Sequence, residues 1–293
     1  MEDIDPARSK SHFAEAIVRD LAWMGLSWEY GPGARGSGAL PPEGPFTQSG
    51  RLESYGAILA LFQERGLAYP CYCTRRELRS IAGAPHADDA GAPYPGICRS
   101  LAKEEQQCRE AEGRTPSWRL LCPQDTVWAF EDAVMGGQSF TLGSCGGDFA
   151  LRRSDGVFAY QLAVVADDIA MGVTHVVRGS DILCSTPRQM YLYSLLDAPL
   201  PEYAHVPLLL DHEGERLAKR HQALTLHSLR EAGVRPETLV GWLAAASGLA
   251  QTYQAMPARA CLPGFSFAAV SRKPLRLPPS PIEYFLGLQR QDI

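Results

Sequence analysis

Apolar residues recur at helical spacing in three long segments of the chain. A spacing of three or four residues predicts helices over residues 9–25, 49–66 and 236–248. The side chains that these patterns assign to the core are, in order along the chain, Phe13, Ile17, Leu21, Met24, Tyr55, Ile58, Leu59, Phe62, Leu239, Trp242, Leu243 and Ala246. Gly25 is a typical stop for the first helix. A shorter apolar pattern predicts one more helix over residues 284–288.

Two further helix starts follow from capping residues. Thr74 and Glu77 have the spacing of a capping box. Thr186 is followed by Pro187 and by Gln189, so we expect Thr186 to be the N-cap of a helix. Both starts follow apolar stretches, as expected where strands and helices alternate.

Short apolar stretches bounded by turn residues predict the strands of the fold. We expect strands over these ranges: 67–72, 117–121, 149–153, 157–165, 174–177 and 206–210. Residues rich in Gly, Pro or Ala predict loops over 31–45, 82–95 and 134–147. Helices that alternate with strands in this way are typical of an α/β fold.

Composition places the chain among folded globular proteins. Its 293 residues allow two domains, or one domain with insertions. No apolar run is long enough for a transmembrane helix, and the start MEDIDPARSK is too polar for a signal peptide, so we expect a cytoplasmic protein without a membrane partner. The net charge of −5 argues against non-specific binding of nucleic acid but leaves room for a local basic face.

The block of residues 151–193 contains the residues best suited to bind a small acid. It places Tyr160, an aspartate pair at 167–168, and Arg178 within apolar runs. A guanidinium can bind a carboxylate while a phenol orients it. The alternative is an ordinary arginine at a strand end, paired with Asp181.

The same block resembles the catalytic core of the glutamyl-type aminoacyl-tRNA synthetases of class I. That family has a run LRRSDG-x-x-x-Y-x-LAVVVDD, followed by GVTHVVRG-x-D-L-x-x-STPRQ. Here residues 151–168 read LRRSDGVFAYQLAVVADD, and residues 172–189 read GVTHVVRGSDILCSTPRQ. The resemblance covers the chain from residue 1 to about residue 250.

The resemblance implies a Rossmann-like catalytic domain that activates glutamate with ATP, together with Mg²⁺. It implies that Arg178 binds the side-chain carboxylate of glutamate and that Tyr160 donates a hydrogen bond to the substrate. Residues 1–6, MEDIDP, match a family motif in which Glu2 receives the substrate ammonium. The resemblance also implies a zinc ion, which would stiffen a segment inserted into the catalytic domain and take no part in the chemistry.

Cysteines form the second chemical pattern. Cys71 and Cys73 are followed by Tyr94 and Cys98, and thiolates one residue apart can share one zinc ion that a later segment completes. From spacing alone, closure by His86 or Cys108 and a set of buried free thiols stay open. The resemblance favours Cys71, Cys73, Tyr94 and Cys98, because glutamyl-queuosine tRNA(Asp) synthetases have Cys-x-Cys and then Tyr-x-x-x-Cys. It implies one zinc ion per chain.

A basic loop forms the third pattern. The loop with Arg216, Leu217, Ala218, Lys219 and Arg220 follows an apolar strand and could bind a polyphosphate, although a solvated basic turn is the commoner case. In the family this place has a KMSKS-type loop. Lys219 then matches the lysine that contacts the ATP phosphates, and Ala218 replaces a serine, so one hydroxyl contact is missing.

Family members begin with a strand and a helix that precede the MEDIDP motif. The strand reads R-F-A-P-S-P, and the helix opens with an H-x-G-H signature that faces ATP. Neither is found in these residues, and His205 and His212 stand in other contexts. The expectation is therefore a Rossmann-like domain without its first strand and helix. Either the start lies at an internal methionine, or the protein is degenerate.

Only 74 residues follow Lys219, which is too few for the anticodon-binding domain of a glutamyl-tRNA synthetase. The resemblance is therefore greatest to the glutamyl-queuosine tRNA(Asp) synthetases, which transfer glutamate to queuosine in the anticodon of tRNA(Asp). We expect four segments: a catalytic core at 1–70 and 150–235, a zinc-bearing insertion at 71–149, and a helical extension at 236–293.

Two alternatives stay open at this point. The chain could be a truncated glutamyl-tRNA synthetase, or an inactive remnant that binds glutamate or tRNA without adenylation. A monomer is the expected state.

Overall fold

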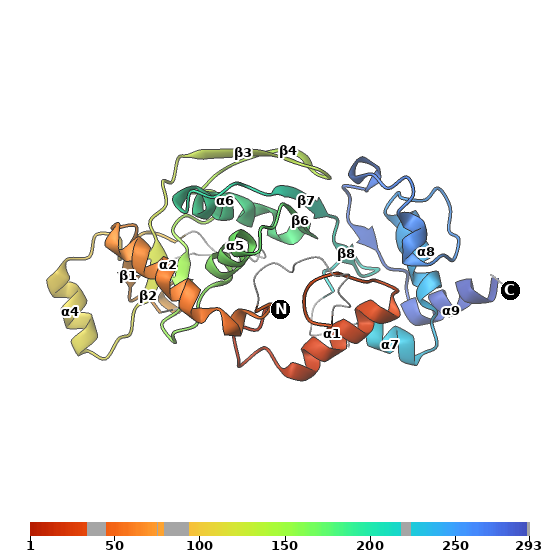
Figure 1. The fold of residues 1–293 in the computed structure, drawn as a ribbon, viewed down its shortest axis with the longest axis horizontal. Coiled ribbons are helices and arrows are strands. Elements are labelled where there is room, and N and C mark those ends of the chain that lie inside the picture. Colours follow the sequence, from red (N-terminus) through yellow and green to blue (C-terminus); the bar gives the residue numbers. More distant parts are fainter. Residues whose placement is uncertain (34–44, 75, 79–93, 218–223, 292–293) are drawn as a thin grey trace.

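The computed structural model of the 293-residue chain describes residues 1–33, 45–74, 76–78, 94–217 and 224–291. The molecule is elongated, and three parts follow one another along its long axis (Figure 1). A small sheet and a peripheral helix lie at one end, the main sheet with its helices lies in the middle, and a helical unit lies at the other end. The mixture of helices and strands confirms the α/β class expected from the sequence.

The main sheet has four strands in the order β4-β3-β7-β6. Their bounds are β3 (Val127–Asp132), β4 (Gly136–Thr141), β6 (His175–Gly179) and β7 (Glu202–Val206). Strands β3, β7 and β6 run parallel, and β4 returns antiparallel to β3 as a hairpin.

A crossover connects the two adjacent parallel strands. The 3₁₀ helix η2 (Ser180–Ser185) and the helix α6 (Thr186–Leu195) lead from β6 to β7. Parallel neighbours need such a crossover, and the unit agrees with the Rossmann-like expectation. Helix α5 (Tyr160–Ala170) packs on α6, and α6 packs on β3.

The small sheet is antiparallel, with the strand order β1-β2-β5. Its strands are β1 (Ala68–Cys71), β2 (Ser117–Leu120) and β5 (Ala150–Arg152). The preceding elements are η1 (Gln48–Gly50) and α2 (Leu52–Glu64), and α4 (Lys103–Ala111) lies at the far end of the molecule (Figure 1).

The C-terminal unit is mostly helical and also includes the first helix of the chain. Its elements are α1 (Ser11–Trp23), α7 (Leu226–Glu231), α8 (Pro236–Ala246), η3 (Ala258–Cys261), η4 (Phe267–Ala269) and α9 (Pro281–Gln291). Strand β8 (Leu209–Leu210) pairs in parallel with β9 (Leu275–Arg276) and so joins this unit to the middle of the molecule. Arg230 of α7 donates to Asp20 of α1 at 2.9 Å.

Two large hydrophobic clusters stabilise these parts. The main cluster contains Tyr55, Leu59 and Phe62, which confirms the core face expected of the helix at 49–66. It also takes side chains from residues 120–149 and from α5 and α6, so it spans the expected boundaries at 70 and 150. The second cluster joins Met24 to α7, α8 and α9. The division into segments stays a prediction.

The core face expected of the first helix is partly wrong. Phe13 and Ile17 are 55% and 51% exposed. Helix α1 contacts the rest of the protein mainly through its C-terminal end, where Trp23 and Met24 join the second cluster. Its N-terminal half therefore has no core to cover among the described residues.

Three other expectations need correction. Residues 160–165, expected in a strand, form the first part of α5. Residues 136–141, expected in a loop, form β4. The strand expected at 206–210 is divided between the end of β7 and the short β8.

Of the two capping predictions, the box at Thr74 and Glu77 is confirmed and the N-cap at Thr186 is wrong. The box is present, because the Thr74 amide donates to Glu77 at 2.5 Å and the Glu77 amide donates to Thr74 at 3.2 Å. Helix α6 begins at Thr186, although its N-cap is Ser185. The Thr186 hydroxyl is therefore available for another partner.

Candidate active site and metal centre

Arg178 lies near the end of β6, with its guanidinium among buried side chains. Its Nε donates to Nε2 of His205 at 2.9 Å, its Nη1 to Oε1 of Gln189 at 2.6 Å, and its Nη2 to Oγ1 of Thr186 at 2.8 Å. These bonds use three of the five N–H groups of a guanidinium. One N–H on each terminal nitrogen is left for the Tyr160 hydroxyl or for a ligand carboxylate.

The partners of Arg178 are uncharged, so they orient its charge without neutralising it. No carboxylate pairs with Arg178 within the described part of the chain. Asp181, the partner that the alternative interpretation expected, pairs with Arg216 at 2.8 Å. An arginine held in this way attracts an anionic ligand.

Tyr160 lies in the first turn of α5, close to Arg178 and Glu2. Burial raises the pKa of its hydroxyl, the negative charge of Glu2 raises it further, and the charge and hydrogen bond of Arg178 act in the opposite direction. The structure therefore brings together the three residues that the resemblance assigned to glutamate.

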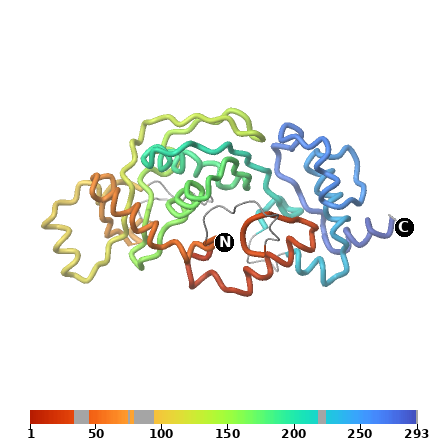
Figure 2. The backbone as a smooth tube through the Cα atoms, viewed as in Figure 1, coloured from red at the N-terminus to blue at the C-terminus, as the bar shows by residue number. Residues whose placement is uncertain are grey.

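Glu2 is held in place through its neighbours in the chain. The N-terminal ammonium of Met1 donates to the carbonyl of Phe46 at 2.6 Å, and the amide of Ser49 donates to Asp3 at 2.9 Å. Figure 2 shows the N-terminus in the middle of the molecule. Desolvation raises the pKa of Glu2, the ammonium of Met1 lowers it, and Asp167 raises it.

Asp168 adds a second carboxylate to this group. Burial raises its pKa to about 6, and the adjacent Asp167 adds to the rise, while the charge of Arg178 opposes it. Asp167 itself is buried and accepts from Tyr55 at 2.8 Å, and it pairs with Arg51 at 2.8 Å. Asp167 thus anchors α5 to α2, while Asp168 is the member of the pair whose pKa the charge of Arg178 affects, and Glu2 lies near both carboxylates.

The basic loop begins next to this group. Arg216 binds Asp181 in η2, which directly follows Arg178 along the chain. A tight turn at Asp211, whose carboxylate accepts from the amides of Glu213 and Glu215, leads into the loop. Arg216 and Leu217 line a cavity of about 900 Å³ together with residues of the C-terminal unit. Ala218, Lys219 and Arg220 lie outside the described residues.

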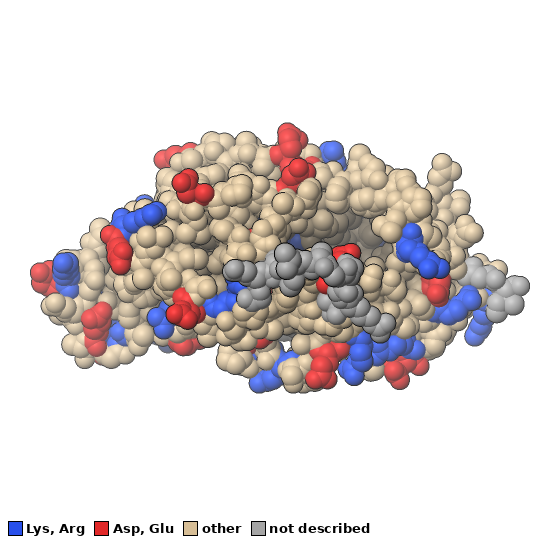
Figure 3. All heavy atoms as spheres, in the orientation of Figure 1, with Lys and Arg blue, Asp and Glu red and all other residues tan. Residues whose placement is uncertain are grey.

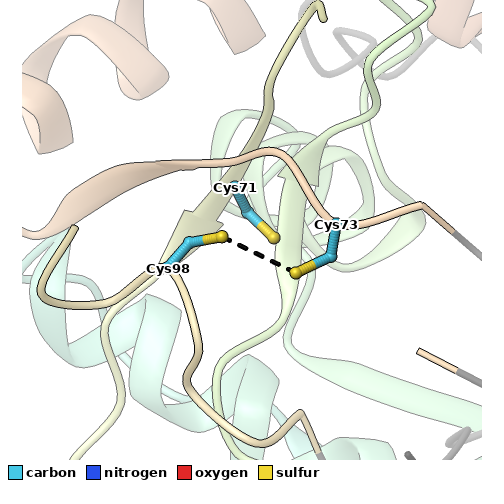
Figure 4. Close-up of side chains that lie close together, drawn as sticks. All are labelled: Cys71, Cys73 and Cys98. Carbon is cyan, nitrogen blue, oxygen red and sulfur yellow. Dashed lines mark hydrogen bonds between the residues drawn. The ribbon is translucent and has the colours of Figure 1, made fainter. Parts of the chain in front are cut away.

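Three cysteines lie together where β1 ends. The sulfur atoms of Cys71, Cys73 and Cys98 all lie within 4.8 Å of one another, and those of Cys73 and Cys98 are 3.6 Å apart. Figure 4 shows the three side chains pointing toward one another, Cys71 and Cys73 from one segment and Cys98 from another. Tyr94 belongs to the same group, because its hydroxyl oxygen lies 3.3 Å from the sulfur of Cys71 and 3.9 Å from that of Cys73.

These distances suit one tetrahedral zinc ion. Zinc–sulfur bonds of about 2.3 Å place tetrahedral sulfur ligands roughly 3.8 Å apart. Burial and the negative charge of Cys71 raise the pKa of Cys73 to about 12, so several thiolates can coexist only beside a cation. Cys108 is exposed on α4 and does not join the group, and His86 lies outside the described residues.

Several residues of the site were not assigned from the sequence. Asp132 and His205 support Arg178 from the neighbouring strands, and Asp168 adds charge. The DD pair at 167–168 was a usable signal for Asp168. The sequence around His205 matches no nucleotide-binding motif, and nothing in the sequence around Asp132 indicates a site.

Over the described residues, no helix combines the length and the apolar character that a membrane span requires. Lys and Arg are interspersed with Asp and Glu on the face that Figure 3 shows.

Comparison with known proteins identifies the family of the chain. The family model described as tRNA synthetases class I (E and Q), catalytic domain, matches residues 1–252. The glutamyl-Q tRNA(Asp) synthetase of Nitratidesulfovibrio vulgaris is 54% identical over 278 residues, which are 95% of this chain and 84% of that protein. The protein with the same name from Symbiobacterium thermophilum is 49% identical over 288 residues, 98% of this chain and 87% of its own length.

Glutamate–tRNA ligases are more distant and longer. Glutamate–tRNA ligase 2 of Alkalilimnicola ehrlichii is 41% identical over 244 residues, which are 83% of this chain but 50% of that protein. A crystal structure of the glutamate tRNA ligase of Elizabethkingia meningosepticum, in complex with its amino acid, has a similar fold, with a TM-score of 0.78 at 24% identity. The match covers 100% of this chain and 62% of the chain in that structure. This likeness shows a shared fold.

Proposed function

Since the chain belongs to the class I tRNA synthetases of the glutamyl and glutaminyl type, we propose that it activates glutamate with ATP and transfers it to queuosine in the anticodon of tRNA(Asp). The observation that carries the proposal is the charge arrangement around Arg178. A guanidinium oriented by uncharged side chains lies close to the Tyr160 hydroxyl and to the carboxylates of Glu2 and Asp168.

This arrangement matches the charges of glutamate. The side-chain carboxylate binds Arg178 through the two remaining N–H groups, and Tyr160 donates to the substrate. The ammonium lies toward Glu2, with Asp168 adding negative potential. A neutral substrate such as glutamine would leave the Arg178 charge unpaired, which is costly in a partly buried site.

The reaction then needs positioning more than covalent help. An oxygen of the glutamate α-carboxylate attacks the α-phosphorus of ATP, a P–O bond to the leaving pyrophosphate breaks, and glutamyl-adenylate forms. We assign the phosphate contact to Lys219. Its loop begins at the Arg216–Asp181 ion pair, which lies beside the residues proposed to bind the substrate glutamate. ATP brings Mg²⁺ as its usual counterion. A hydroxyl of queuosine then attacks the acyl carbon, and AMP leaves.

We assign one zinc ion to Cys71, Cys73, Tyr94 and Cys98. The ion would join the end of β1 to the segment around residue 98 and so stiffen that part of the molecule. Asp148 supports the same segment, because it accepts from Arg99 at 2.6 Å and from the amide of Cys122 at 2.8 Å. The zinc ion has a structural role in this proposal. We further propose that the protein acts as a monomer in the cytoplasm.

The acceptor tRNA decides between this function and the two alternatives. The purified full-length protein is assayed for glutamate-dependent ATP–pyrophosphate exchange and for transfer of labelled glutamate to three RNAs: tRNA(Asp) with queuosine, the same tRNA with guanosine in its place, and tRNA(Glu). We expect exchange, and transfer to the queuosine-containing tRNA alone. Transfer to tRNA(Glu) would identify a glutamyl-tRNA synthetase. Glutamate binding without exchange would identify an inactive remnant.

A further inference from the structure

We propose that Asp132 and His205 are positioning residues that orient Arg178 for the substrate carboxylate, an inference that rests on the glutamate-binding role proposed above. Neither residue has to contact glutamate. They act through the hydrogen bond between His205 and the Nε of Arg178. They thereby determine which N–H groups of the guanidinium are available to a ligand.

The three residues lie on three adjacent parallel strands. Arg178 of β6 and His205 of β7 are register partners, and Asp132 ends β3 on the other side of β7. Nδ1 of His205 lies 2.5 Å from Oδ2 of Asp132, and Nε2 of His205 accepts from Arg178 at 2.9 Å. The side chains of Asp132 and His205 have no exposed surface. A continuous buried chain of hydrogen bonds therefore runs across the sheet.

The hydrogen bonds define the protonation state of His205. The Nε of arginine is always a donor, so Nε2 of His205 must carry a free lone pair. The ring proton then lies on Nδ1 and is donated to Asp132. Burial and the charge of Arg178 lower the pKa of His205, against the effect of Asp132, which agrees with a neutral ring.

Thr186 closes the network on the other side. Its hydroxyl accepts from Nη2 of Arg178 at 2.8 Å and lies 3.3 Å from Nε2 of His205. The Thr186 hydroxyl is thus an acceptor for Nη2 beside the ring. Of the two N–H groups that Arg178 directs toward this side, the one on Nε is matched only by the Nδ1-protonated form of His205.

Asp132 selects this form of the ring. Its Oδ1 accepts from three amides, those of Val134, Met135 and His205, at 2.8 to 3.0 Å, and the His205 amide is shared with Oδ2 at 3.1 Å, so Oδ1 is the oxygen that holds the other two amides. Its Oδ2 is therefore the oxygen that receives the ring proton. In Asp132→Asn the amide oxygen must stay with the three backbone donors, so the new NH₂ group faces Nδ1. The ring must then carry its proton on Nε2, where it meets the N–H of Arg178.

The proposal predicts a specific defect for Asp132→Asn. Two donors would face each other, and the guanidinium would move from its place. A displacement of about 1 Å at a binding group can lower activity by roughly 100-fold. We expect the KM for glutamate to rise by about 10- to 100-fold, whereas the KM for ATP should change little. Glu131→Gln is the matched control, because it makes the same change at the exposed neighbouring residue.

Nuclear magnetic resonance gives a readout that does not depend on activity. The ¹⁵N shifts of the His205 ring report which nitrogen has the proton, and a scalar coupling across the N–H···N bond reports the contact between Arg178 and His205. In the wild type we expect a protonated Nδ1 and a measurable coupling. In Asp132→Asn we expect a protonated Nε2 and no coupling. If the wild type fails to bind glutamate, the proposed function fails, while these signals still test the orientation of Arg178.

A pair of His205 variants covers the case in which Asp132→Asn does not fold. His205→Gln retains an acceptor near the position of Nε2, and His205→Asn retains a donor near Nδ1 but has no acceptor for Arg178. We expect His205→Asn to weaken glutamate binding more than His205→Gln. Glutamate affinity within twofold of the wild type in folded Asp132→Asn, or in both His205 variants, would overturn the proposal. So would a wild-type ring protonated on Nε2.

Discussion

At the scale of single residues, the site contains a positive and a negative charge that lie near each other without forming an ion pair. Among the residues that the structure describes, the guanidinium of Arg178 has uncharged hydrogen-bond partners, and the carboxylates of Glu2 and Asp168 lie near it without an ion pair. Unpaired charges cost stability in a partly buried site. An amino acid with a carboxylate and an ammonium compensates both kinds of charge at once.

Arg178→Lys separates the charge from the geometry of the guanidinium. A lysine retains the charge but cannot bind a carboxylate through two parallel N–H groups. We expect glutamate binding to weaken by about 1.5–3 kcal/mol, the range of hydrogen bonds to charged groups. Calorimetric titration with glutamate measures the loss, and exposed Arg152→Lys is the control. An affinity equal to that of the wild type would remove Arg178 from the binding site.

Asp168→Asn tests whether the ionised Asp168 carboxylate, which we propose to favour glutamate binding, lowers the stability of the folded protein. The pKa of Asp168 is raised from 3.8 to about 6, so its ionised form destabilises the folded state at neutral pH. The asparagine variant should therefore be more stable by about 1–3 kcal/mol at pH 8. The gain should shrink as the pH falls from about 6 to 4, because the wild-type carboxyl is then protonated in the folded state. Urea unfolding at pH 8 and pH 4 measures both effects.

The same variant should bind glutamate less tightly, since negative potential near the substrate ammonium is lost. A variant that is less stable at pH 8, or that binds glutamate as well as the wild type does, would contradict this account of Asp168.

The sequence indicated Arg178 but not the residues that hold it. Its acceptors lie 8, 11 and 27 positions further along the chain, and Asp132 lies 73 positions before His205. Parallel pairing of β6 with β7 and of β7 with β3 brings Arg178, His205 and Asp132 together, and the crossover helix α6 supplies Thr186 and Gln189. No local pattern contains that information. The sequence around His205 gives no indication of a site. His205 becomes a partner of Arg178 because the two residues are register partners on neighbouring strands.

At the scale of elements, the errors of prediction have two physical causes. The segment at 157–165 is a short apolar run with β-branched and aromatic residues, a pattern that suits a strand or a buried helix. Tertiary packing favours the helix α5 over a strand, because the buried face of this segment packs between α2 and α6. The β3–β4 hairpin was missed because β4 is rich in glycine and polar residues, which are rare in strands.

The cysteine group allows a direct test at this scale. We expect purified protein to contain about one zinc ion per chain, and Cys73→Ser should lower both zinc content and melting temperature, because binding of a structural metal adds to folding free energy. Elemental analysis and thermal unfolding measure the two effects. Cys108→Ser, at an exposed thiol outside the group, should change neither.

Chelation should reproduce the effect of Cys73→Ser. Removal of zinc from the wild type should lower its melting temperature to about that of the variant, and the variant itself should not respond to the chelator. A protein without zinc whose stability Cys73→Ser leaves unchanged would make these residues ordinary packing side chains.

At the scale of the whole molecule, the first helix belongs to the last unit of the chain. Trp23 and Met24 pack into the cluster built by α7, α8 and α9, and Asp20 pairs with Arg230. Contacts between residues about 200 positions apart make the C-terminal unit depend on the N-terminal segment. They also connect it to Glu2, which lies only a few residues before α1.

Phe285→Ala tests this coupling. Phe285 is fully buried in the second cluster and meets the ring of Trp242 edge to face, with the ring centroids 5.5 Å apart. Loss of such a side chain should destabilise the protein by about 3–5 kcal/mol. Because Met24 shares the cluster, hydrogen exchange should rise over residues 11–24 as well as over α8. The control is Tyr284→Ala, at a neighbouring aromatic residue that is 40% exposed. Exchange that rises in α8 but stays unchanged over 11–24 would show that α1 folds independently of the C-terminal unit.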